Sequence, residues 1–176
     1  YADIMISDSK MSSTCEMVYD FICLLNKNKI NNKIATCLYT GIVADTGSFR
    51  YPSTTSKTLK TGSELINYGV NVTEIFEKLH NNFQFKRLKL LGAAINNFKK
   101  IDELPVLYTS ITDDDQKINS FKKGDSEGFV NFGLSVTGIL CSVLFIEKKE
   151  EGLIKISFRS KGDFKVNIFA SRYFSG

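Results

Sequence analysis

The fold is decided by the stretch Gly41-Ile-Val-Ala-Asp-Thr-Gly-Ser-Phe-Arg-Tyr-Pro-Ser-Thr-Thr55, because here a helical pattern ends at an acidic residue and a polar turn that contains glycine. Apolar residues recur upstream at helical spacing, namely Ile34, Ala35, Leu38, Tyr39, Ile42 and Val43. The pattern predicts a buried helix that ends at Asp45, followed by a tight turn that Gly47 allows. Free carbonyl groups end a helix, and a carboxylate beside them adds a hard oxygen ligand. We therefore expect Asp45 to bind a metal.

Helices also dominate the residues on either side of this stretch. The segment Ser12-Ser-Thr-Cys-Glu16 opens a helix, and Ser13 and Glu16 have the spacing of a capping box. Further helices are predicted over residues 55–68, 73–80 and 85–98. Residues 2–6 have the pattern of the end of a buried strand.

The pattern changes after the last of these helices. The helix over 85–98 runs into Lys99-Lys-Ile-Asp-Glu-Leu-Pro105, and we expect a linker over residues 98–104 between a first domain, residues 1–97, and a second domain, residues 105–176. In the second domain we expect a strand over 106–112, short helices over 113–120 and 128–136, a hairpin of strands over 139–147 and 153–159, and a last helix over 164–174. The second domain is therefore predicted to be mixed α/β.

Composition and charge exclude several classes of protein. The chain has 176 residues, of which 43% are hydrophobic and 24% charged, as in ordinary globular proteins. Its formal net charge of +4 is spread over both halves, so neither half resembles a domain that binds long duplex DNA. No apolar run approaches the roughly 20 residues of a membrane helix, and no leader pattern opens the sequence, so we expect a cytoplasmic protein without a membrane partner. Its four cysteines form no CxxC motif and are expected to be buried free thiols.

A second candidate site lies in Phe158-Arg-Ser-Lys-Gly-Asp163, where a strand leads into a loop before a helix. Arg159 offers a planar fork for phosphate oxygens, Ser160 offers a hydroxyl, and a helix start offers free amide groups. Together they favour an anion-binding site. The alternative is a solvated loop in which Asp163 caps the helix.

Three signatures together resemble the DHH phosphoesterase superfamily, and within it the oligoribonucleases of the nanoRNase type that are also pAp phosphatases. Residues 12–16 resemble the helix start that follows the DHH motif, and residues 41–49 resemble the fourth acidic motif. Residues 158–162, with Ile168-Phe-Ala170, resemble the substrate-binding part of the DHH-associated C-terminal domain. The order and spacing of the signatures cover nearly the whole chain.

The resemblance implies an α/β fold: the C-terminal part of a parallel-sheet DHH domain, mostly helical in this chain, followed by a smaller mixed α/β substrate-binding domain. It implies an active site in the cleft between the domains and two divalent metal ions, with manganese the expected metal. By the same resemblance Asp45 is a metal ligand and catalytic residue. Arg159 and Ser160 hold a phosphate or the substrate backbone, and Gly176 is what remains of a glycine-rich segment that contacts the substrate.

The chain departs from the family's pattern at both ends. It contains neither the DHH triplet nor the early DxD motif, and no glycine-rich segment ending in histidine follows Gly176. We therefore expect a fragment that is inactive alone, because one carboxylate does not hold a pair of metal ions that each take about six ligands. The single histidine, His80, is expected to be a surface or helix-packing residue.

Several functions stay open at this point. The leading hypothesis is a manganese-dependent phosphoesterase that hydrolyses short oligonucleotides and pAp-like nucleotides. Within the same superfamily the alternatives are hydrolysis of cyclic dinucleotides, of polyphosphate or pyrophosphate, and of longer single strands. A nucleotide-binding module without catalysis is the alternative of another class, if the chain is natural as written. The preferred substrate, RNA against DNA, the metal and the oligomeric state, a homodimer included, are left open by the sequence.

Overall fold

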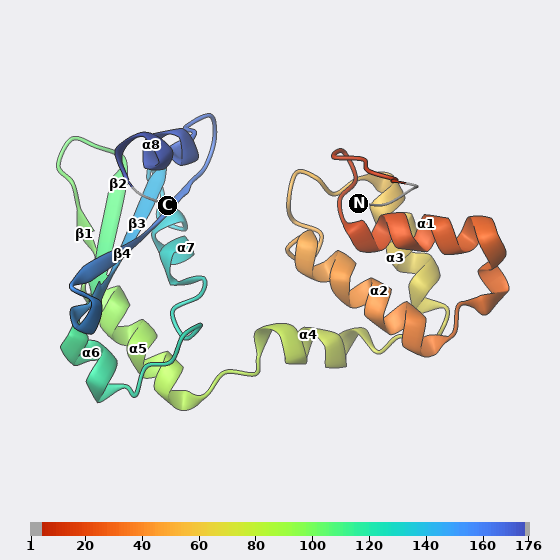
Figure 1. The fold of residues 1–176 in the computed structure, drawn as a ribbon, viewed down its shortest axis with the longest axis horizontal. Helices are drawn as coiled ribbons and strands as arrows, with labels where there is room; N and C mark the ends of the chain where they lie inside the picture. Colours follow the sequence, from red (N-terminus) through yellow and green to blue (C-terminus); the bar gives the residue numbers. More distant parts are fainter. Residues whose placement is uncertain (1–4, 175–176) are drawn as a thin grey trace. The chain divides into compact units, whose positions relative to one another are not determined.

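The computed structural model describes residues 5–174 and divides the chain into two compact units, Tyr1–Asn82 and Phe83–Gly176 (Figure 1). Each unit has its own buried core. The strand predicted over residues 2–6 falls largely outside the described residues, and its last two residues, Met5 and Ile6, are exposed and belong to no helix or strand. None of the described helices is long and apolar enough to cross a membrane.

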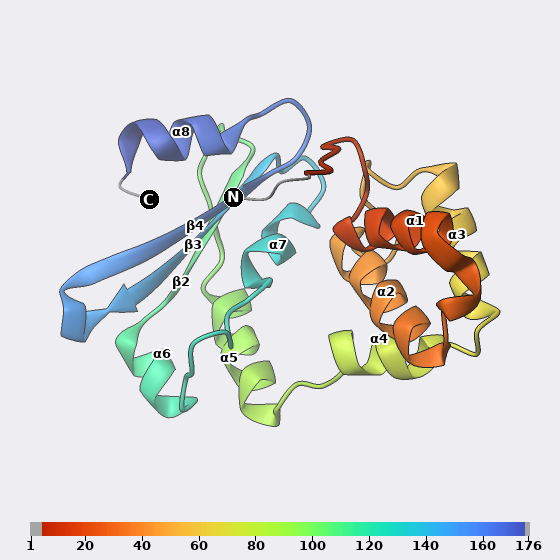
Figure 2. The ribbon, with the colours of Figure 1, turned by 45° about the vertical axis from the view of Figure 1, so that its right-hand side comes forward.

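The described part of the first unit is built from helices. They are α1 (Thr14–Asn26), the short 3-10 helix η1 (Lys27–Lys29), α2 (Asn32–Asp45), α3 (Ser56–Ile66) and α4 (Val72–His80). Figures 1 and 2 both show α1 and α3 beside α2. The apolar face predicted for α2 is confirmed, since Ala35 and Ile42 are fully buried and pack with Leu65 of α3. Helix α2 is therefore the central element of this unit.

The close contact between α1 and α2 depends on a glycine. A Cβ atom on Gly41 of α2 would lie 2.2 Å from the sulfur of Cys15 in α1. Atoms in real structures do not approach so closely, so any larger residue at this position would displace the Cys15 side chain or move the two helices apart. The contact brings the first turn of α1 beside the last turn of α2, which ends at Asp45.

The second unit is a four-stranded mixed sheet with helices on both faces. Its elements are α5 (Phe85–Asn96), β1 (Lys99–Lys100), β2 (Val106–Ile111), α6 (Asp113–Ile118), α7 (Phe129–Leu134), β3 (Cys141–Lys148), η2 (Lys149–Glu151), β4 (Leu153–Ser160) and α8 (Val166–Tyr173). The strand order is β1-β2-β3-β4. Strands β2 and β3 are parallel, with Val106 opposite Cys141, and the other two pairs are antiparallel. The mixed α/β character predicted for this part is confirmed.

The side chains of β3 alternate between two cores, because successive residues of a strand point to opposite faces. Leu144 and Ile146 pack with α5 and α7 in one core. Cys141 and Val143 pack with Val166 of α8 in the other. Strand β4 lies at the edge of the sheet, so its outer side pairs with no other described strand.

The structure divides the chain earlier than the linker predicted over residues 98–104. Helix α5 packs with the second unit, because Leu90 and Ala94 are buried against Phe129 of α7 and Leu144 of β3. The sequence had placed this helix in the first domain. Part of the predicted linker, β1, is itself an antiparallel strand of the sheet.

Two further sequence predictions are corrected by burial. Apolar spacing in the sequence predicts that α5 buries a face made of Leu88, Leu91, Ala94, Ile95 and Phe98. Ala94 is buried as predicted, but Leu88 and Ile95 are about half exposed and Leu90 is buried as well. The four cysteines are free thiols as predicted, but only Cys141 is buried, and Cys37 is exposed. Apolar residues lie on more than one face of α5, so their spacing alone did not identify the buried face.

Candidate functional site

Asp45 is the last residue of α2, and its exposed carboxylate is held by a serine from α1. Ser13 donates a hydrogen bond from Oγ to Asp45 Oδ2 at 2.6 Å. Ser13 is also the N-cap of α1, and its Oγ accepts a bond from the backbone N–H of Cys15 at 3.1 Å. One hydroxyl therefore caps one helix and fixes the carboxylate at the end of the next.

The thiol of Cys15 responds electrostatically to this carboxylate. Burial raises the pKa of Cys15, and the nearby charge of Asp45 raises it further, because a thiolate is disfavoured both in apolar surroundings and beside an anion. Cys15 therefore stays protonated at neutral pH. Its side chain packs against Gly41.

The turn after Asp45 has an unusual backbone. Gly47, Ser48 and Phe49 all have φ near +60°, the left-handed region that non-glycine residues rarely adopt. Buried Thr46 holds the turn closed, since its Oγ1 donates to the carbonyl of Ile42 at 2.6 Å and accepts from the N–H of Phe49 at 3.0 Å. Strain of this kind persists only where the surroundings impose it. The turn predicted at Gly47 is thus a rigid structure.

His80 lies beside this turn, whereas the sequence placed it away from every motif. Its Nε2 atom lies 3.3 Å from Ser48 Oγ, within hydrogen-bond distance. Its ring also packs on Phe76 one helical turn earlier, with the ring centroids 4.7 Å apart. Helix packing was predicted for His80, but its contact with the Asp45 turn was missed. A contact between residues this far apart in the chain leaves no local sequence pattern.

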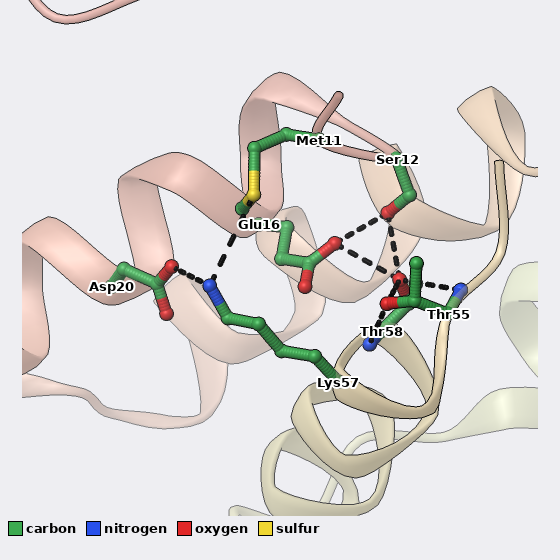
Figure 3. Close-up of polar contacts among 7 residues, drawn as sticks. All are labelled: Met11, Ser12, Glu16, Asp20, Thr55, Lys57 and Thr58. Carbon is green, nitrogen blue, oxygen red and sulfur yellow. Dashed lines mark hydrogen bonds and ion pairs between the residues drawn. The ribbon is translucent and has the colours of Figure 1, made fainter. Parts of the chain in front are cut away.

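A buried polar cluster lies at the start of α1 (Figure 3). The carboxylate of Glu16 is 1% exposed; its Oε2 accepts bonds from Ser12 Oγ and, at 3.1 Å, from Thr58 Oγ1 of α3. The predicted capping box of Ser13 and Glu16 is therefore wrong: Ser13 caps the helix, but Glu16 turns inward to Ser12 and Thr58. The reason is that α3 supplies a tertiary partner that competes with the local one.

An ion pair closes the outer side of the same cluster. Lys57 of α3 is hydrogen-bonded to Asp20 of α1, and its Nζ lies 3.9 Å from Met11 Sδ (Figure 3). The hydrogen bond that Lys57 donates to Asp20 raises the pKa of Lys57 above its ordinary value. Two separate contacts therefore connect the start of α3 to α1.

The described residues do not form a complete metal site. Within residues 5–174, no group of three or more histidine, cysteine, aspartate or glutamate side chains could hold a metal ion. Asp45 suits a single ligand of a larger set, because it is exposed and Ser13 bonds to only one of its two oxygens. No protein donor bonds to Oδ1 among the described residues. A fixed carboxylate with a free oxygen is the kind of donor that divalent metals take, and the role of Asp45 as a metal ligand stays a prediction.

In the second unit, Arg159 and Ser160 occupy the end of β4 as predicted. Arg159 is exposed, pairs in the ladder with Ser142 and donates from its guanidinium to the carbonyl of Phe158 at 2.8 Å. The hydroxyl of Ser160 donates to the carbonyl of Phe164 and so closes the loop. Helix α8 begins only at Val166 and has no side-chain cap, so the alternative role of Asp163 as a cap is wrong.

A groove of about 870 Å³ runs along β4 and α8 and includes Arg159 in its wall. Aromatic rings gather at this place: Phe158 lies 5.2 Å from Phe174 and 5.9 Å from Phe169, measured between centroids. The sequence analysis did not predict this cluster. The third of the predicted substrate-binding residues, Gly176, lies outside the described residues.

Comparison with known proteins gives a consistent set of relatives. The chain is 32% identical over 188 residues to the bifunctional oligoribonuclease and PAP phosphatase NrnA of Bacillus subtilis, covering 100% of this chain and 55% of the relative. It is 33% identical over 165 residues to the protein of the same name from Thermus thermophilus, covering 92% and 47%. An exopolyphosphatase-related protein from Bacteroides fragilis superimposes with a TM-score of 0.92 at 36% identity, covering 98% of this chain and 51% of that one. No family model matches the chain.

These relatives confirm the resemblance to bifunctional oligoribonucleases and PAP phosphatases that the sequence predicted. The chain spans about half the length of the curated relatives it matches. The α/β fold class is consistent with the solved structure as well. Roles for Asp45, Arg159 and Ser160 stay predictions.

Proposed function

We propose that this chain, a relative of the bifunctional oligoribonucleases and PAP phosphatases, is part of a cytoplasmic phosphoesterase that uses divalent metal ions, with manganese the expected metal. Its proposed substrates are short oligonucleotides and pAp-like nucleotides. The observation that best supports the proposal is the exposed carboxylate of Asp45, held by Ser13 at the end of a buried helix. Asp45 belongs to the motif at residues 41–49, which resembles the metal-binding acidic motif of the DHH superfamily.

In the first unit Asp45 has the role of one metal ligand. When bound, the metal pair would supply a hydroxide at neutral pH and offset charge on the phosphoryl oxygens. The chain's own contribution is to hold one carboxylate in place at the end of α2. The rigid turn at residues 46–49 and the bond from Ser13 both serve that purpose.

In the second unit Arg159 has the role of binding a phosphate. Its guanidinium is a planar fork that matches phosphate oxygens, and its bond to the Phe158 carbonyl leaves further N–H donors. Ser160 closes the loop that presents Arg159, because its hydroxyl bonds to Phe164. The aromatic rings near the groove offer faces on which a base can stack, which is typical of sites for short single strands.

The test is hydrolysis by the full-length protein of RNA dinucleotides to pentanucleotides and of pAp, with added Mn²⁺. We expect Asp45→Asn to abolish turnover, because an amide is a weaker metal ligand than a carboxylate. Arg159→Ala should raise KM about 10-fold with a smaller change in kcat, the cost of one bond to a charged group. Arg159→Lys is the matched variant: it keeps the charge but not the fork, so its KM should fall between those of the wild type and Arg159→Ala. Equal activity in all four proteins would refute both assignments.

Hydrolysis of polyphosphate is the second candidate function. It is favoured by one observation, the similarity in structure to a protein described as exopolyphosphatase-related. Phosphate release from polyphosphate or pyrophosphate, with no release of mononucleotides from short RNA, would favour it over the first. Binding of pAp without turnover of any of these substrates would instead indicate a nucleotide-binding module.

A further inference from the structure

We propose that Ser13 is a positioning residue for Asp45, which sets the orientation of the metal-binding carboxylate through a hydrogen bond. This inference rests on the proposed function, because it concerns the ligand that the proposal assigns. The serine belongs to α1 and the aspartate to α2, so the bond joins two helices that meet at Gly41.

The hydroxyl of Ser13 accepts one hydrogen bond and donates another. Its oxygen already accepts from the N–H of Cys15, which leaves the O–H to donate, and it donates to Asp45 Oδ2 at 2.6 Å. Ser13 is 4% exposed, so its hydroxyl is largely shielded from water. A bond from a buried hydroxyl to an ionised carboxylate is of the stronger kind. Oδ2 is thereby fixed, and Oδ1 stays available to a metal.

The need for such a bond follows from the place of Asp45 in the chain. It is the final residue of α2, and helix ends fray unless side chains hold them. The backbone after Asp45 is rigid, but a rigid backbone does not select the rotamer of an exposed carboxylate. Among residues 5–174, Ser13 is the hydrogen-bond donor that reaches this side chain.

Ser13 is itself held by the buried cluster next to it in the sequence. Ser12 Oγ donates to Glu16 Oε2, and Thr58 Oγ1 lies 3.1 Å from both Ser12 Oγ and Glu16 Oε2 (Figure 3). The two adjacent serines therefore bond in different directions: Ser12 fixes the start of α1 to α3, and Ser13 fixes Asp45. The position of the donor is set by α3 as well as by α1.

The test measures binding of Mn²⁺ alone by isothermal titration calorimetry to the full-length protein, with activity as a second measurement. The variants are Ser13→Gly, Ser13→Thr, Asn31→Gly and Asp45→Asn. Glycine at an N-cap costs a helix only a few tenths of a kcal/mol, so Ser13→Gly removes the hydroxyl and largely keeps the cap. Asn31→Gly is the matched control, because Asn31 caps the opposite end of α2 through Ile34 N–H.

We expect Ser13→Gly to weaken Mn²⁺ binding about 10-fold, as is usual when a group that orients a metal ligand is lost. Ser13→Thr keeps the hydroxyl and should bind within about threefold of the wild type, like Asn31→Gly. In turnover, Ser13→Gly should need more Mn²⁺ for half-maximal rate while the KM for substrate stays unchanged.

Three results would overturn the inference: wild-type Mn²⁺ affinity in Ser13→Gly, an equal loss in Asn31→Gly, or an equal loss in Ser13→Thr. The last would assign the effect to packing around residue 13. Failure of the proposed function is distinguishable from these, because it would show as wild-type Mn²⁺ binding by Asp45→Asn. If Asp45→Asn loses Mn²⁺ binding but Ser13→Gly binds like the wild type, the positioning role of Ser13 is refuted and the role of Asp45 as a metal ligand is not.

Discussion

The two candidate regions of the molecule are built in different ways. Asp45 is held by one side chain, that of Ser13 at the N-cap of another helix, and a buried cluster of hydroxyl groups and a carboxylate lies next to Ser13. Arg159 is held by the ladder of β4 and by the carbonyl of its own neighbour, Phe158. Helix packing therefore determines the first site, whereas the backbone of an edge strand determines the second.

This difference teaches where each site is vulnerable. Substitutions that move α1 against α2 should disturb Asp45 without touching it, because the bond from Ser13 depends on that packing. Substitutions in the core of the second unit should leave Arg159 in place, as long as β4 stays paired with β3. The following predictions test this contrast, beginning with the largest expected effect.

Gly41→Ala should destabilise the first unit most. Its methyl group would lie 2.2 Å from the sulfur of Cys15 and 3.1 Å from its Cβ, so the Cys15 side chain must change rotamer or α1 and α2 must move apart, and we expect a loss of about 3 kcal/mol in the free energy of unfolding. Gly92→Ala is the matched control, since Gly92 lies in α5 of the second unit and a Cβ atom there meets no atom within 4 Å. It should stabilise the protein by about 0.5 kcal/mol. Urea denaturation measures both, and an equal effect of the two would contradict the close contact.

Thr58→Val should have the next largest effect. The substitution keeps the shape but removes the hydroxyl that bonds to Ser12 and Glu16, which are both buried. Ser12 and Glu16 keep their bond to each other but both lose the hydrogen bond to Thr58, and the N–H of Thr55 loses its acceptor, which together should cost about 2 kcal/mol of unfolding free energy. Thr109→Val makes the same change in the second unit, where the buried hydroxyl bonds only to the carbonyl of Ala94, and should cost about 1 kcal/mol. Thermal and urea unfolding would show whether the order is reversed.

Glu64→Gln should have the smallest effect, and the effect should depend on pH. Hydrogen bonds from Lys27 and then from Tyr19 lower the pKa of Glu64 below its ordinary value of 4.5. A lowered pKa means that the stabilisation is complete above the unfolded-state pKa and disappears as the pH falls through the folded-state value. The difference between wild type and variant should therefore be present at pH 7, below about 1 kcal/mol, and vanish in acid.

The control for this last prediction is Glu74→Gln, whose carboxylate bonds to Lys78 one helical turn away and is more exposed. Its effect on the unfolding free energy at pH 7 should be smaller still. Unfolding curves recorded from pH 7 down to about pH 3 give both comparisons. A difference between wild type and Glu64→Gln that grows in acid would show that the sign is wrong.

The sequence by itself determined most of the elements and the position of the metal-ligand candidate. Apolar spacing and N-caps act within a few residues, so α2, its end at Asp45 and the hairpin of β3 and β4 follow from local pattern. The same local pattern placed Arg159 and Ser160 at the end of a strand.

Only the tertiary structure decided what holds these residues. Ser13 and Asp45 are 32 positions apart in the chain, and Glu16 and Thr58 are 42 apart, so no local pattern connects them. Local spacing predicted a capping box of Ser13 and Glu16 and placed α5 in the first domain. Both predictions were wrong because local spacing does not show which distant residues pack against a side chain or a helix. Burial made that choice: a buried carboxylate bonds to whichever hydroxyl groups packing brings to it, and an apolar helix face packs where a sheet is available to cover it.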